Sequence, residues 1–112
     1  WAMGEGFTWD SADLLIDQAI AADAWAHARS LIRAGDHRLV VLDEVTYPIN
    51  WAWIDVTDVV ATIADRPPHV NVICTGRNAP NELIEIADTV TEMTKVKHAM
   101  DLGIGARKGI EY

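Results

Sequence analysis

The sequence predicts an α/β protein with a mainly parallel sheet. Segments with helical spacing of apolar residues alternate with short, strand-like apolar segments, which is the order that β–α–β units produce. One short segment, residues 38–42, is apolar without interruption from Leu39 to Leu42. A continuous apolar run is typical of a strand buried on both faces in the middle of a parallel sheet. We therefore expect the chain to be organised around this strand.

The first helix is expected at about residues 11–34, after a strand end at residues 1–3. Ser11 is a suitable N-cap, and Gly35 suits the position just beyond the helix. The apolar residues expected to form its buried face are Leu14, Leu15, Ile16, Ala19, Ala22, Ala26, Leu31 and Ile32.

Further elements follow the central strand. A second helix is expected after Asp55, because apolar residues recur at helical spacing from Val56 to Ala64 before two prolines. A strand at 69–75, a short helix at 80–87 and a last strand at 89–96 follow, the last one predicted from its β-branched residues. The tail after Lys97 is expected to be loop or a short helix.

The segment 45–53 is aromatic and has no clear pattern. Pro48 argues against a regular helix through it. Its rings, Tyr47, Trp51 and Trp53, could wall a flat ligand or close the core.

Composition limits the classes of protein to consider. A chain of 112 residues is one domain at most, and its net charge of −8 argues against a nucleic-acid binder. The single cysteine, Cys74, excludes an internal disulfide and fits a reducing compartment. No apolar run is long enough for a membrane span, so we expect a soluble, cytoplasmic protein. The start at Trp1 rather than Met suggests a portion of a larger protein.

Charged residues follow the predicted strands at the ends that should share one edge of the sheet. These are Asp43 and Glu44, then Thr75, Gly76 and Arg77, then Lys95, Lys97 and His98. Paired carboxylates suit Mg²⁺, and Arg or Lys suits phosphate oxygens, so this edge is a candidate nucleotide site. The alternatives are a solvated acidic turn and a solvated strand edge.

Other signatures are absent from the sequence. It contains no G-x-x-x-x-G-K-[ST] loop to hold phosphates, no Cys/His zinc spacing and no evident Ser-His-Asp triad. By itself the chain therefore lacks half of a nucleotide site.

Several motifs together resemble those of the corrinoid adenosyltransferase family, in the family's order along essentially the whole chain. They begin with the stretches at 4–9, 40–44 and 75–80, and continue at 87–88, 90–93, 96–98, 103–104 and 108–112. The resemblance implies that residues 1–112 are the C-terminal part of a single domain of three-layer, P-loop NTPase-like (RecA-like) fold. The family's phosphate-binding loop would precede this part.

The resemblance also implies an activity, in which the 5′-adenosyl group of ATP is transferred to the Co(I) of a corrinoid. It implies Mg²⁺, a homodimer, and a separate reductase that supplies electrons, with no nucleic-acid or membrane partner. Glu44 and Asp43 would hold the metal and act in catalysis, and Phe7 and Trp9 would pack against the corrinoid. Arg77, Thr75, Gly76, His98 and Lys97 would bind the nucleotide. The alternatives are a non-catalytic corrinoid-binding or delivery protein and a fragment of a generic P-loop ATPase.

Overall fold

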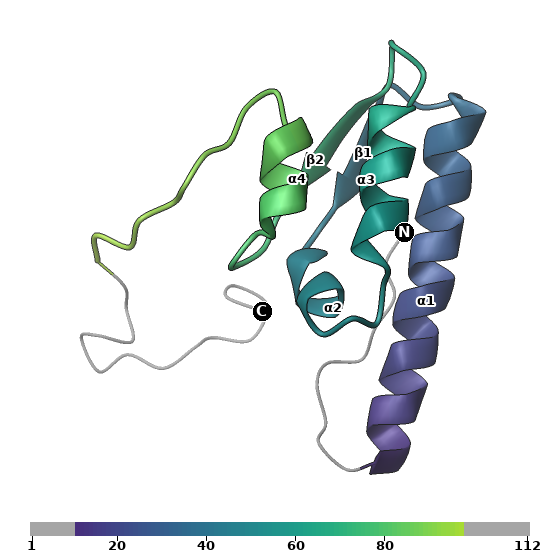
Figure 1. Cartoon of the computed structure of the whole chain (residues 1–112), viewed down its shortest axis with the longest axis vertical. Coiled ribbons are helices and arrows are strands. Elements are labelled where there is room, and N and C mark those ends of the chain that lie inside the picture. Colours follow the sequence, from purple (N-terminus) through teal and green to yellow (C-terminus); the bar gives the residue numbers. More distant parts are fainter. Residues whose placement is uncertain (1–10, 98–112) are drawn as a thin grey trace.

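The computed structural model describes residues 11–97 and confirms the α/β class. Its elements are α1 (Ser11–Ala34), β1 (Leu39–Leu42), α2 (Thr46–Asn50), α3 (Val56–Ala64), β2 (Asn71–Cys74) and α4 (Asn81–Ile86) (Figure 1). The expected strand end at 1–3 and the tail after Lys97 lie outside the described residues. No helix within 11–97 combines the length and apolar character that a membrane span needs.

The two strands form a parallel sheet, in register from Leu39 opposite Asn71 to Leu42 opposite Cys74. The chain passes between them through α2 and α3. Helices α1 and α3 pack on one face of the sheet, where Val40 and Leu42 join the core formed with Ile32 and Val59 (Figure 1). The parallel arrangement is confirmed, and the described residues make two layers, helices on a sheet.

The prediction that the central strand is buried on both faces is wrong for the described chain. Leu39 and Val41 are each 53 % exposed, while Val40 and Leu42 are buried. On the neighbouring strand, Ile73 is 48 % exposed. Successive side chains of a strand point to opposite faces, and no described element packs against the face that carries these three residues. Within residues 11–97, one side of the sheet is therefore apolar and open.

Helix α1 has the predicted bounds, and Gly35 follows it with a positive φ of 71°. Its predicted buried face is only partly correct, because Leu15 and Ile16 are largely exposed and Trp25 and Ile32 are the buried residues. The helix has 24 residues and is about 36 Å long, whereas a four-residue strand spans about 13 Å. Its N-terminal turns therefore extend beyond the sheet (Figure 1).

A polar contact fixes α1 against α3. The indole N–H of Trp25 and the guanidinium of Arg29 each donate to Oδ2 of Asp58 at 2.7 Å. These contacts, with the Trp25 hydrogen bond first in importance, hold the pKa of Asp58 below its usual range. Helix α3 itself begins as predicted, with Asp55 accepting a hydrogen bond from the backbone N–H of Thr57.

The expectation that Pro48 prevents a helix is wrong, because α2 includes it. Pro48 lies in the first turn, where backbone N–H groups have no intrahelical acceptor, so its missing N–H is tolerated. Helix α4 is close to the predicted range, with Pro80 one position earlier than expected, as the N-cap.

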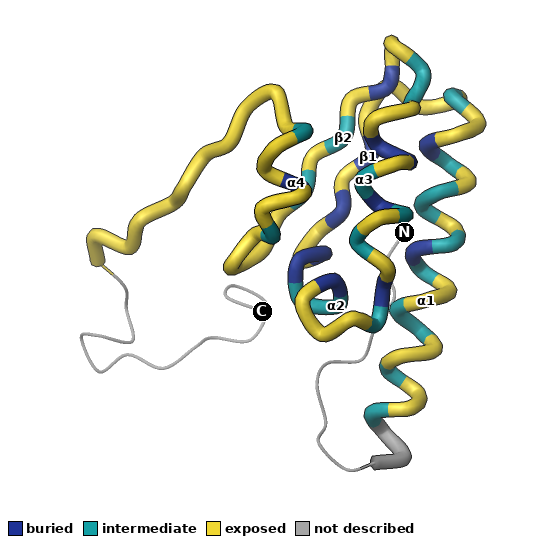
Figure 2. The backbone as a smooth tube through the Cα atoms, viewed as in Figure 1, coloured by how far each residue is buried: buried dark blue, intermediate teal, exposed yellow. Residues whose placement is uncertain are grey.

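The predicted strand at 89–96 is also wrong. Residues 87–97 are irregular and exposed, and they lead away from α4 as an extended segment (Figures 1 and 2). β-branched residues fit a pleated surface, but they form a strand only where another strand offers hydrogen bonds. No described strand lies beside this segment.

Candidate functional site

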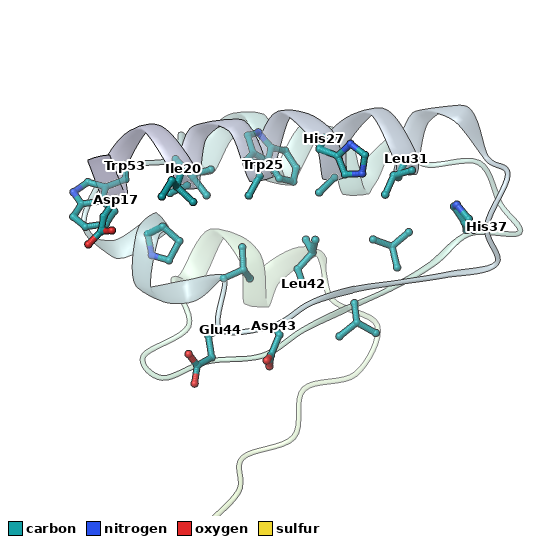
Figure 3. Close-up of a pocket in the computed structure, with 18 of the residues that line it drawn as sticks. Asp17, Ile20, Trp25, His27, Leu31, His37, Leu42, Asp43, Glu44 and Trp53 are labelled. Carbon is teal, nitrogen blue, oxygen red and sulfur yellow. The ribbon is translucent and has the colours of Figure 1, made fainter. Parts of the chain in front are cut away.

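The candidate site lies at the carboxyl end of β1, where Asp43 and Glu44 follow the strand. Glu44 has a positive φ of 55°, an uncommon conformation for a residue other than glycine. Both carboxylates point to the same side of the chain, away from α1 (Figure 3). In a regular strand, neighbouring side chains would point to opposite faces. The left-handed turn at Glu44 therefore interrupts the alternation and gives a paired, exposed acidic site.

The end of β2 is bonded to this acidic pair, as the parallel sheet predicts. Thr75 Oγ1 donates to Oδ1 of Asp43 at 2.7 Å and accepts from the backbone N–H of Glu44 at 2.9 Å. The structure thus brings together Asp43, Glu44 and Thr75, three of the residues expected at the site.

Helix α2 supports the loop that follows β2. The Thr46 side chain is 2 % exposed and fills the space in which a side chain at Gly76 would stand. Asn50 Nδ2 donates to the backbone oxygen of Asn78 at 2.8 Å. These two contacts hold Gly76 and Asn78 in place, and the exposed Arg77 lies between them in the chain. Thr46 and Asn50 were missed in the sequence, because a threonine and an asparagine near a proline carry no pattern that distinguishes them from ordinary helix-end residues.

Arg77 is available to a ligand in the described part of the chain. Its guanidinium makes no hydrogen bond or ion pair with residues 11–97. The other predicted cations are elsewhere, because the segment that carries Lys95 and Lys97 runs away from the sheet (Figure 1). Phe7, Trp9 and His98 lie outside the described residues.

A cavity of about 870 Å³ runs between α1 and β1 and reaches the acidic pair. Figure 3 shows Ile20, Trp25 and Leu31 on the helix side and Leu42 on the strand side. Asp17 and Trp53 also line this cavity (Figure 3). The sequence did not indicate this cavity, because helical spacing gives a face and not its distance from the sheet.

Trp53 also belongs to a row of aromatic rings. The ring centroids of Tyr47 and Trp51 are 5.7 Å apart, and those of Trp51 and Trp53 are 4.9 Å apart, both in tilted geometry. Trp51 is exposed, and none of the three rings belongs to the buried core, so the row forms part of the surface.

Cys74, at the end of β2, is not suited to nucleophilic chemistry. Burial raises the pKa of its thiol to about 11, so it stays protonated at neutral pH. Cys74 is partly buried against the core, where it acts as a small packing residue.

The acidic pair suits a Mg²⁺ ion that is shared with water and substrate, and it is too small a donor set for a metal site built from protein side chains alone. Within the described residues no group of three or more His, Cys, Asp or Glu side chains is placed to hold a metal. Mg²⁺ usually binds one or two carboxylates and completes its shell with water and substrate phosphates. Two adjacent exposed carboxylates meet that requirement.

Comparison with known proteins extends over the whole chain. The family model described as ATP:corrinoid adenosyltransferase BtuR/CobO/CobP matches residues 1–112. Several proteins named corrinoid adenosyltransferase are similar to this chain. One from Sinorhizobium sp is 43 % identical to it over 100 % of this chain and 53 % of the relative. One from Pseudomonas aeruginosa is 46 % identical over 98 % of this chain and 54 % of the relative. One from Escherichia coli is 38 % identical over 98 % of this chain and 56 % of the relative. The chain spans about half the length of these relatives.

Proposed function

Because the chain belongs to the ATP:corrinoid adenosyltransferase family, we propose that the whole protein transfers the 5′-adenosyl group of ATP to the Co(I) of a corrinoid. The observation that carries this proposal is the family match along all 112 residues. The acidic pair at the end of β1, with Arg77 nearby in the tethered loop, supports it.

The reaction defines what the site must do. The electron pair of Co(I) forms a bond to C5′ of ATP, the C5′–O bond breaks, and its electron pair leaves with triphosphate. Negative charge therefore grows on the triphosphate, and cationic groups aimed at it lower the barrier. When bound, Mg²⁺ supplies positive charge at the phosphate oxygens. In this proposal Asp43 and Glu44 hold that ion, and Arg77 binds the phosphates.

The remaining predicted residues take the roles that the family resemblance implies. Phe7 and Trp9 pack against the corrinoid, and Gly76, Lys97 and His98 belong to the nucleotide site. The proposal also includes a cytoplasmic homodimer, with electrons supplied by a separate reductase.

An anaerobic assay with Mg-ATP and chemically reduced cobalamin tests the proposal. We would compare this chain with a version extended upstream through the phosphate-binding loop that the resemblance implies. Adenosylcobalamin from the longer protein, lost in Glu44→Gln, is the expected result. Glu85→Gln, at an exposed position outside the motif stretches, serves as a control with the same change of charge.

A second candidate is a corrinoid-binding or delivery protein without catalysis. Cobalamin binding that ATP does not alter, with no product from either version, would support this candidate and overturn the proposed activity.

A further inference from the structure

Thr75 joins the ends of the two strands through one hydroxyl group. Its Oγ1 accepts a hydrogen bond from the Glu44 backbone and donates one to the Asp43 carboxylate. Its backbone N–H donates to the carbonyl oxygen of Leu42 at 3.1 Å. A threonine has one hydroxyl proton and one backbone N–H, so both of its donors are already used within the protein.

We propose that Thr75 is a positioning residue for the acidic pair and does not itself bind the nucleotide. The inference rests on the proposed function, in which Asp43 and Glu44 hold a divalent cation. It replaces the direct nucleotide contact that the resemblance implies for Thr75, because a phosphate oxygen needs a donor and Thr75 has none left.

The hydroxyl acts on each acid in a different way. At Glu44 it accepts from the backbone N–H, and so it stabilises the left-handed turn, with φ of 55°, that puts both carboxylates on one side. At Asp43 it binds Oδ1 and fixes the rotation of the carboxylate. Among residues 11–97, Oδ2 of Asp43 and the Glu44 carboxylate have no hydrogen-bond or ion-pair partner. The oxygens that remain are those a cation would use.

This arrangement is that of an outer-shell partner of a metal ligand. Such partners orient the ligating oxygens without touching the metal, and their loss usually weakens metal binding by about 10- to 100-fold. The turn at Glu44 should relax when the hydroxyl is removed, because no other described side chain bonds to that backbone N–H.

The test uses the full-length protein with Mn²⁺ as the probe, followed by electron paramagnetic resonance. Thr75→Val removes the hydroxyl at nearly constant shape, Thr75→Ser keeps it, and Thr94→Val makes the same change at an exposed threonine. We expect Thr75→Val to bind Mn²⁺ at least about tenfold more weakly. Thr75→Ser and Thr94→Val should bind as the wild type does. Thr75→Ala is the second variant if the valine side chain disturbs folding.

A measurement independent of metal accompanies it. Amide hydrogen exchange at Glu44 should be faster in Thr75→Val and unchanged in Thr75→Ser. Equal Mn²⁺ affinity in Thr75→Val and wild type, alongside weaker binding in Glu44→Gln, would overturn the inference and leave the proposed function standing. Mn²⁺ affinity that Glu44→Gln leaves unchanged would instead overturn the metal role on which the inference rests.

Discussion

At the scale of single residues, the space beside Gly76 is already filled by Thr46. A Cβ at position 76 would stand 2.8 Å from Thr46 Cβ and closer still to its hydroxyl oxygen. The backbone φ of 149° is also one that other residues rarely adopt. We therefore expect Gly76→Ala to lower the free energy of unfolding by about 2 kcal/mol, measured by urea denaturation.

The chain offers a matched control for this change. Gly35 also has a positive φ, but a Cβ at position 35 would stand 3.3 Å from its nearest neighbours, atoms of His69 and Pro67. Gly35→Ala should therefore destabilise less than Gly76→Ala. Adding Thr46→Ala to Gly76→Ala should recover part of the loss, because it removes the colliding atoms. Equal stability of Gly76→Ala and wild type would contradict the packing described.

Which residues of the site lie close together could be predicted from the sequence only where the direction of the strands determines it. Asp43 and Thr75 each follow an apolar strand, and parallel strands end at a common edge, so their proximity could be expected from the sequence. The Thr46–Gly76 contact could not be predicted, because it depends on how α2 packs against the loop after β2. The left-handed turn at Glu44 was equally hidden, since glutamate carries no preference for it.

At the scale of elements, the Asp58 carboxylate joins α1 to α3 and makes their contact depend on pH. Its pKa is lowered by the Trp25 indole and by Arg29, so its charged form is favoured in the folded state. A lowered pKa contributes stability above the unfolded value of 3.8, and this contribution is lost as the pH falls through the lower folded value. We expect Asp58→Asn to reduce stability by about 1 kcal/mol at pH 7, given that the pair is partly exposed.

The pH profile separates this charge effect from a general loss of packing. The stability difference between wild type and Asp58→Asn should shrink as the pH falls below 3.8, measured by thermal unfolding. Asp23→Asn, at an exposed position of α1, should leave stability nearly unchanged. A difference that persists undiminished at low pH would rule out the proposed role of the Asp58 charge.

The residues at which helices begin and end could be predicted more readily than the contacts that helices and strands make with the rest of the chain. The limits of α1 and the start of α3 follow from local signals, namely Gly35 and Asp55. The exposure of Leu15 and Ile16 depends on how far the sheet reaches along the helix. The strand predicted at 89–96 failed for a related reason, because Val90 and Val96 have β propensity but no described partner strand.

At the scale of the whole molecule, the sheet has helices on one face and none of the described chain on the other. In an α/β protein with a parallel sheet, both faces are usually covered, because every strand carries apolar residues on both sides. Leu39, Val41 and Ile73 make up the open face here. The chain also spans about half the length of its relatives. The three-layer expectation thus remains a prediction for a longer protein.

The open face predicts how the 112-residue chain behaves when it is prepared by itself. Exposed apolar surface on a short sheet favours pairing with another copy, so sedimentation velocity should show association that increases with concentration. Val41→Lys should shift the distribution toward monomer, because a charge at the centre of the face opposes its burial. Met93→Lys adds the same charge on the exposed segment after α4, away from the sheet, and should leave association unchanged. A wild-type chain that stays monomeric at all concentrations and melts in one sharp transition would contradict this prediction, because the open face would then not drive association.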